Sequence, residues 1–141
     1  MNRFRQWTIF LAEDNPDDIE ITRRALTRSH LGCELIVARD GVEALTMLRD
    51  ESLRLDFALL DINLPKLNGL QVLEQVRLDP RLKTLPIVVL SASDREEDVR
   101  RAYELGANSY IQKPVVFEKF VAVLEVLGQY WFEIARLPRS P

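Results

Sequence analysis

Residues 57–65, FALLDINLP, place Asp61 directly after four consecutive apolar residues and four positions before a proline. A short, continuous apolar run of this kind is typical of a β-strand that is buried on both faces of a parallel sheet. Pro65 lacks the amide hydrogen that a central strand requires, so the strand ends before it. We therefore expect Asp61 to lie at the rim of the sheet, at the carboxyl end of a central strand. In open α/β sheets, ligands and reacting groups bind at this edge.

The composition indicates one soluble domain with a substantial core. The chain has 141 residues, of which 47% are hydrophobic and 29% charged. A net charge of −3 argues against a general nucleic-acid-binding protein. Cys33 is the only cysteine, which excludes an intrachain disulfide and a cysteine-based metal site. The first apolar run, residues 9–12, is too short for a secretory signal or a membrane span. We expect a cytoplasmic protein that binds neither nucleic acid nor membrane.

Apolar segments alternate with amphipathic segments along the whole sequence. The expected strands are residues 7–12, 35–38, 57–60, 86–90 and 109–112. The expected helices cover about 15–29, 40–50, 68–79, 93–106 and 116–136. Residues that favour helix starts stand at four of these positions, namely Asn15, Asp40, Asn68 and Ser93. Gly106 is placed to end the fourth helix.

Strict alternation of strand and helix predicts a parallel sheet that helices cover on both faces. Five units favour an α/β fold of the doubly wound, flavodoxin-like (βα)5 type over a closed eight-unit barrel. In that fold the strand order reverses between the first and third strands, and their carboxyl ends form a crevice. Glu13, Asp14 and Asp61 follow these two strands, Ser91 follows the fourth strand and Lys113 the fifth. We expect these side chains at one edge of the sheet.

This combination of side chains suits the chemistry of a phosphoryl group. Carboxylates in one crevice repel one another unless they bind a cation or take up protons. Oxygen-only ligands select a hard cation, and Mg²⁺ fits because it also accepts waters and phosphoryl oxygens as ligands. Lys113 adds a fixed positive charge that can stabilise a phosphoryl group in transfer. One carboxylate can then act as the nucleophile and form an acyl phosphate.

The order of these residues resembles the receiver domain of two-component response regulators, and the resemblance covers essentially the whole chain. It is carried by LAEDN at 11–15, LDINLP at 60–65, LSAS at 90–93 and GANSYIQKP at 106–114. The resemblance implies the strand order 2-1-3-4-5, which this family itself exemplifies, and a cis peptide between Lys113 and Pro114. It further implies a sensor histidine kinase as the phosphoryl donor and Mg²⁺ as the cofactor, with Mn²⁺ or Ca²⁺ as substitutes. Such a protein is a phosphoacceptor in signalling, not an enzyme with a substrate of its own.

By resemblance, Asp61 is the phosphoacceptor and Lys113 pairs with the phosphoryl group. Asp14 and Asp61 would bind Mg²⁺ together with the backbone carbonyl of Asn63, and Glu13 would act through water.

Ser91 and Tyr110 would form the switch pair of a receiver domain. In this role the hydroxyl of Ser91 moves toward the phosphoryl group while the ring of Tyr110 turns inward. Many receivers carry threonine in place of Ser91, but serine keeps the hydroxyl that the role requires.

The last expected helix has an apolar arc wider than one sheet contact needs. One interpretation is an amphipathic helix with a frayed end. The other is a homodimer through the fourth helix, fifth strand and fifth helix, with contacts from Val123, Tyr130 and Phe132. This region, with the Asn-Leu-Pro after Asp61, resembles the small single-domain regulators that are paired with bacterial phytochromes. We expect one receiver domain over 1–141, with its core at about 7–127, a helical extension at about 128–141 and no output domain.

Two other functions are compatible with a strand-end aspartate. A phosphatase of the haloacid-dehalogenase type uses a second aspartate two residues later as its acid and base, but Asn63 stands at that position and cannot transfer a proton. A pseudo-receiver has the fold without phosphorylation, and it predicts that an acid or the lysine is missing. The sequence retains all of them.

Overall fold

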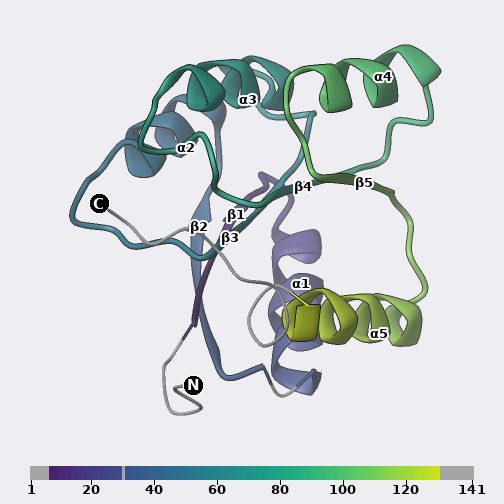
Figure 1. Ribbon diagram of the computed structural model, residues 1–141. Coiled ribbons are helices and arrows are strands. Elements are labelled where there is room, and N and C mark those ends of the chain that lie inside the picture. The colour runs from purple at the N-terminus through teal and green to yellow at the C-terminus, as the bar shows by residue number, and fades with distance from the viewer. Residues whose placement is uncertain (1–6, 30, 131–141) are drawn as a thin grey trace.

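The computed structural model describes residues 7–29 and 31–130, and a parallel sheet lies at its centre (Figure 1). Its strands are β1 (Trp7–Ala12), β2 (Cys33–Ala38), β3 (Phe57–Leu60), β4 (Ile87–Ser91) and β5 (Ser109–Gln112). They lie in the order β2-β1-β3-β4-β5, and each neighbouring pair is parallel. The predicted flavodoxin-like (βα)5 fold and its strand order are confirmed.

Helices cover both faces of this sheet. They are α1 (Pro16–Arg28), α2 (Gly41–Leu48), α3 (Gly69–Leu78), α4 (Glu96–Glu104) and α5 (Phe117–Gly128). Figure 1 shows α1 and α5 on one face of the sheet and α2, α3 and α4 on the other. One helix follows each strand, as a parallel sheet with crossover connections requires.

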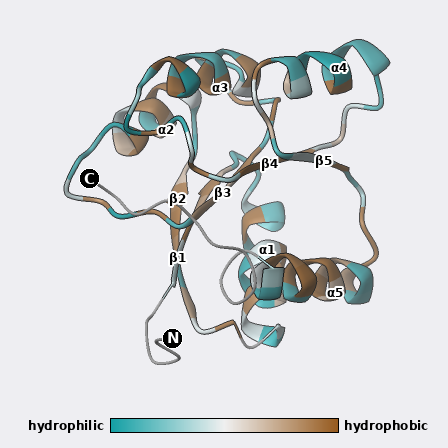
Figure 2. Cartoon of the chain, viewed as in Figure 1, coloured by the Kyte–Doolittle hydropathy of each residue, from teal (hydrophilic) through white to brown (hydrophobic). Residues whose placement is uncertain are grey.

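The core consists of two hydrophobic clusters, one on each face of the sheet. In β1, Ile9 and Leu11 pack in the cluster that includes α1 and α5, whereas Phe10 and Ala12 pack in the cluster of α2 and α3. Every residue of β3 and β4 is buried. Figure 2 shows these strands and α5 as largely hydrophobic. Burial on both faces explains why the apolar run before Asp61 does not alternate with polar residues.

Three of the expected helix caps are formed by side-chain oxygens. Asn15 accepts hydrogen bonds from the first backbone amides of α1, and Asp40 accepts one from α2. Asn68 and Gln71 cap each other's backbone amides at the start of α3. These caps fix where α1 and α3 begin, which matters because both helices start beside the carboxyl edge of the sheet.

The expected cap at Ser93 is wrong. Helix α4 begins at Glu96. Arg95 therefore occupies the N-cap position, and its side chain forms no capping hydrogen bond. Ser93 lies in the loop after β4, where its hydroxyl donates to Asp98 at 2.5 Å and accepts from the Arg95 amide at 3.3 Å. The hydroxyl thus bonds to a side chain within the first turn of α4, and the chain remains irregular for two more residues.

Two glycines allow helix starts to pack directly on the loop that follows β3. A Cβ on Gly69, at the start of α3, would lie 2.1 Å from the carbonyl oxygen of Asp61. A Cβ on Gly41, at the start of α2, would lie 1.9 Å from the carbonyl oxygen of Leu67. The amide of Gly41 also donates to the carbonyl of Pro65 at 3.0 Å. The loop is therefore held between two helices.

The regular part of α5 ends at Gly128, within the part of the chain that the structure describes. The expected continuation of this helix to residue 136, including Phe132, lies outside the described residues. The Lys113–Pro114 peptide is cis, as the resemblance implied. Across residues 7–29 and 31–130, no helix is long and apolar enough to cross a membrane.

Candidate functional site

Backbone hydrogen bonds between neighbouring strands align the residues that follow them. The amide of Asp61 donates to the carbonyl of Ala12 at 3.0 Å, and that of Lys113 donates to Ser91 at 2.8 Å. The amide of Glu13 donates to the last residue of β2 at 2.9 Å. The parallel register therefore continues one residue beyond the strands, and Glu13, Asp61, Ser91 and Lys113 meet at one edge.

The ammonium group of Lys113 lies at the centre of this edge. Its Nζ donates to Glu13 Oε1 at 2.5 Å, to Asp18 Oδ2 at 2.9 Å and to Asp61 Oδ2 at 3.1 Å. The side chains of Glu13 and Asp61 are 3% and 7% exposed, and that of Asp18 is 35% exposed. Buried carboxylates require such a partner, because an unpaired charge is costly away from water.

Burial and charge change the acidity of two of these groups. Burial raises the pKa of Glu13, the hydrogen bond from Lys113 opposes that effect, and the charge of Asp61 adds to it, giving a pKa of about 6. Burial alone would lower the pKa of Lys113, but its hydrogen bonds to Glu13 and Asp18 and the charge of Asp61 raise it above the ordinary lysine value. Lys113 therefore stays charged at neutral pH, and its positive charge is fixed in the site.

The carboxylate of Asp61 is held at both oxygens. Oδ2 accepts from Lys113, and Oδ1 accepts from the backbone amide of Asn63 at 3.0 Å. Asn63 therefore contacts the carboxylate through its main chain. A carboxylate held in this way presents a fixed orientation to an incoming electrophile.

Asp14 follows Glu13 at the same edge and is exposed. Among the residues that the structure describes, no three acidic, histidine or cysteine side chains surround a common point as metal ligands would. The carboxylates of Glu13, Asp18 and Asp61 instead converge on Lys113. Three carboxylates face one ammonium and the exposed Asp14 follows Glu13 in the chain, and this excess of oxygen donors and negative charge fits a hard divalent cation. The residues present at this edge therefore fit Mg²⁺.

Ser93 connects the two residues that were expected to form the switch. Ser91 is fully buried, and its hydroxyl accepts from the amide of Ser93 at 3.3 Å. The carbonyl of Ser93 accepts from the hydroxyl of Tyr110 at 2.8 Å. The ring of Tyr110 is half-buried and packs against the cluster of α2 and α3. One residue of the loop between β4 and α4 thus contacts both Ser91 and Tyr110.

Sequence reasoning missed Asp18 and Ser93 as parts of this site. An acid in the first turn of a helix is already explained by the helix dipole, so Asp18 gave no sign of a second role. The position of this turn, however, was a usable signal for a site residue. Helix α1 starts soon after the acids that follow β1, so its first turn has to lie near them. Ser93 was taken for a helix cap, and no sequence signal distinguishes that role from its bonds to Ser91 and Tyr110.

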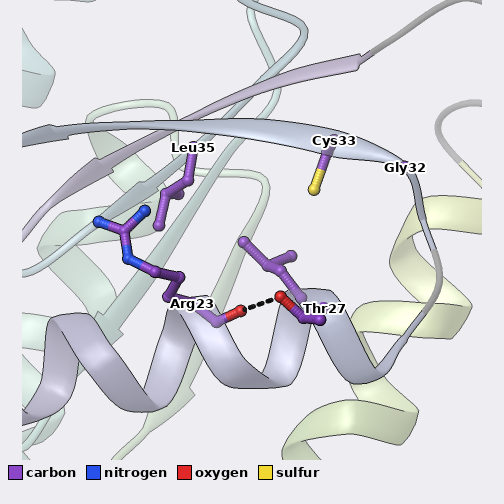
Figure 3. A pocket seen from close by; sticks show the side chains of 6 residues that line it. Arg23, Thr27, Gly32, Cys33 and Leu35 are labelled. Atoms are coloured by element: carbon purple, nitrogen blue, oxygen red, sulfur yellow. Dashed lines mark hydrogen bonds between the residues drawn. The ribbon is translucent and has the colours of Figure 1, made fainter.

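A hollow of about 530 Å³ lies elsewhere, between α1 and β2. Figure 3 shows Arg23 and Thr27 of α1 opposite Cys33 and Leu35 of β2 across this hollow. Because α1 and β2 run in opposite directions, the hollow lies near the amino end of β2, away from the carboxyl edge. It contributes none of the side chains described above.

The fold and the site together define a receiver domain. The family model for the response regulator receiver domain matches residues 9–125, and the chain belongs to this family. Among its relatives, response regulator Rcp1 of Synechocystis sp. is 36% identical over 137 residues, which cover 94% of this chain and 93% of Rcp1.

Two solved structures extend this similarity to three dimensions, and one of them is a phytochrome response regulator. The phosphorylated cyanobacterial phytochrome response regulator RcpA has a TM-score of 0.86 and 38% identity, over 96% of this chain and all of RcpA. The Mn²⁺-bound form of Rcp1 has a TM-score of 0.82 and 35% identity, over 94% of this chain and 99% of the other. This chain is therefore a response regulator receiver, similar over nearly its full length to the phytochrome response regulator RcpA and to response regulator Rcp1.

Proposed function

We propose that this chain is a response regulator that accepts a phosphoryl group on Asp61 from a sensor histidine kinase. The observation that carries the proposal is the environment of Asp61. Its buried carboxylate stands at the end of β3, and its two oxygens accept from Lys113 and from the amide of Asn63. A nucleophilic carboxylate with an adjacent fixed cation suits transfer of an anionic phosphoryl group.

In the transfer step, an oxygen of Asp61 forms a bond to phosphorus and the bond from phosphorus to the kinase's imidazole nitrogen breaks. The electron pair of the broken bond remains on the imidazole. The positive charge of Lys113 balances the negative charge on the phosphoryl oxygens.

Mg²⁺ would be held by Asp14, Asp61 and the backbone carbonyl of Asn63, with Glu13 acting through water. Bound there, it neutralises charge on the transferring phosphoryl group. The Mn²⁺-bound structure of Rcp1 supports this proposal through the similarity of the two chains.

The response to phosphorylation would pass through Ser91 and Tyr110. A Ser91 hydroxyl that turns toward the phosphoryl group gives up its bond with the amide of Ser93. The carbonyl of Ser93 binds Tyr110, so a shift of this loop changes the position of the ring. Tyr110 belongs to β5, which lies between α4 and α5 in the sequence. A movement of its ring can therefore alter the surface that α4, β5 and α5 form.

We further propose that this surface forms a homodimer. Half-buried Val123 and exposed Tyr130 lie on or just beyond α5, and Val126, 64% exposed, lies on the same helix. Exposed apolar side chains that recur along one helix favour burial against a partner. Similarity to the phytochrome response regulator RcpA supports a phytochrome sensor kinase as the donor and a cytoplasmic location for this chain. In this proposal the receiver core spans about 7–127.

Phosphorylation can be tested by intact mass after incubation with acetyl phosphate and Mg²⁺. We expect the wild-type chain to gain one phosphate, and Asp61→Asn to gain none. A chelator should abolish the gain. Stoichiometric labelling of Asp61→Asn would assign the acceptor to another residue. Sustained turnover of a generic phosphate ester, without accumulation of the phosphorylated chain, would instead support the phosphatase alternative.

A further inference from the structure

Asp18 differs from the other two carboxylates that bind Lys113. Glu13 and Asp61 follow strands at the carboxyl edge, whereas Asp18 belongs to the first turn of α1. Its carboxylate is also much more exposed, at 35% against 3% for Glu13 and 7% for Asp61. The Asp18 contact nevertheless measures 2.9 Å, slightly shorter than the 3.1 Å contact of Asp61.

The three contacts occupy all the hydrogen-bonding capacity of the lysine. An ammonium group has three protons to donate, and Lys113 directs them at three carboxylates. Phosphorylation converts the singly charged carboxylate of Asp61 into an acyl phosphate with a charge of about −2 and three strong acceptor oxygens. These oxygens compete for the same protons, so full pairing of Lys113 with the phosphoryl group weakens an existing contact.

Asp18 is the partner that can be released at the lowest cost. Glu13 is buried, and freeing its carboxylate from the lysine would leave a buried charge with the Asn15 amide as its remaining hydrogen-bond donor. The exposed side of Asp18 already contacts water, so its carboxylate can be hydrated when the lysine moves away. The hydrogen bond from the Thr22 hydroxyl goes to the backbone carbonyl of Asp18, so it does not depend on this side chain.

We propose that Asp18 is a positioning residue that restrains Lys113 in the unphosphorylated site. It holds the ammonium toward α1 and must release it before the lysine pairs fully with the phosphoryl group. Asp18 therefore lowers the affinity of the site for a phosphoryl group. This inference rests on the proposed function, because it concerns the pairing of Lys113 with phosphorylated Asp61.

Asp17 supplies a matched control for the test. It stands beside Asp18 in the first turn of the same helix and is exposed. Asp17→Asn and Asp18→Asn remove the same charge from the same helix end and change the helix dipole interaction to a similar extent. Of these two acids, Asp18 is the one whose side chain contacts Lys113. A difference between the two variants therefore reports the contact rather than the general charge.

The experiment is a titration with fluoroberyllate, an analogue of the phosphoryl group, at saturating Mg²⁺. We expect Asp18→Asn to bind it on the order of tenfold more tightly than wild type, because the removed contact competes directly for the lysine. Asp17→Asn should change the affinity by less than about twofold. Asp18→Glu keeps the carboxylate and should restore wild-type affinity. Asp18→Ser, which also suits a helix start, should behave as Asp18→Asn does.

Two results overturn the inference, and they are distinguishable. If the wild type binds fluoroberyllate but Asp18→Asn binds no more tightly than Asp17→Asn, Asp18 does not restrain the lysine, while the proposed function stands. If the wild type neither binds fluoroberyllate nor gains phosphate mass, the proposed function fails and the inference fails with it.

Discussion

The hydroxyl of Tyr110 donates to the backbone carbonyl of Ser93 at 2.8 Å, which joins β5 to the loop after β4. The amide of the same Ser93 contacts the buried hydroxyl of Ser91. The main chain of one residue therefore lies between the hydroxyl of Ser91, beside the proposed phosphorylation site, and the ring of Tyr110 at the α4–β5–α5 surface. Two substitutions can separate the chemistry of the site from its response.

Ser91→Ala should leave phosphorylation largely intact and weaken the response. The methyl group cannot bond to the phosphoryl group, so the Ser93 loop receives no signal from it. We expect intact mass to show labelling near wild-type levels, and nuclear magnetic resonance to show a smaller fluoroberyllate-induced shift of the Tyr110 amide. Tyr110→Phe, which removes the donor to Ser93, should lower the free energy of unfolding by about 1 kcal/mol. A full Tyr110 shift in Ser91→Ala would exclude the hydroxyl as the switch.

Lys113→Met should slow phosphorylation by acetyl phosphate at least about tenfold, because the site keeps its carboxylates and loses its fixed cation. The measurement is the time course of mass gain at saturating Mg²⁺. Lys119→Met is the control. Lys119 is exposed on α5, and its substitution removes the same charge at a place outside the site. A wild-type rate in Lys113→Met would show that the phosphoryl group is stabilised without the lysine.

Glu13 should make the metal-free protein less stable as pH rises. Its folded pKa of about 6 exceeds the ordinary value of 4.5, so the folded state binds the proton more tightly than the unfolded state. The stabilisation is complete below pH 4.5 and is lost as pH rises through about 6. The free energy of unfolding of wild type minus that of Glu13→Gln should therefore fall by about 2 kcal/mol between roughly pH 4 and pH 7. Urea denaturation in chelator measures it, and a pH-independent difference contradicts the expectation.

Gly69→Ala should destabilise the protein by more than about 2 kcal/mol, since the new Cβ would overlap the carbonyl oxygen of Asp61. Gly32→Ala serves as the comparison. Gly32 has a positive φ of 62° but open space around it, so alanine there should cost only about 1 kcal/mol of backbone strain. Thermal unfolding measures both. Gly69→Ala should also slow labelling of Asp61, because the backbone of the acceptor has to move. Equal stabilities of the two variants would show that the loop yields easily.

Val126→Glu should weaken the proposed homodimer, because it places a charge on the apolar surface of α5. Leu78→Glu is the control, since Leu78 is 72% exposed at the end of α3. Sedimentation over micromolar concentrations, with and without phosphorylation, measures both association and its coupling, which we expect to be at most about 3 kcal/mol. A strict monomer in all states would refute the dimer and leave α5 as a surface for another partner.

The sequence predicted the fold best where several residues in one short stretch indicate the same element. The buried run before Asp61 and the proline after it predict both a central strand and the place where it ends. Once the strand order is known, the parallel pairing of the strands brings the residues at the carboxyl ends of β1, β3, β4 and β5 together. At the edge of the sheet this logic weakens: β2 begins at Cys33, two residues earlier than expected, because its residues are only partly buried and the apolar pattern is faint.

Asp18 and Ser93 were not predicted as site residues, because the same residue type at the same position also has a common structural role at a helix start. An acid in a first helical turn suits the helix dipole whether or not it also contacts a lysine about a hundred residues away, as Asp18 does. A serine before a helix suits capping equally well, but Ser93 uses its main chain to join Ser91 and Tyr110. Only the three-dimensional neighbours distinguish these cases.

The two glycines that hold the loop after β3 also indicate where this molecule does not bend. The starts of α2 and α3 pack so closely against that loop that there is no room for a side chain at Gly41 or Gly69. We therefore expect the backbone of the proposed acceptor to stay in place and any rearrangement to occur in the loop after β4, where Ser93 bonds to Ser91, Asp98 and Tyr110. Sequence changes that tune the duration of a signal have more freedom in that loop than beside the acceptor.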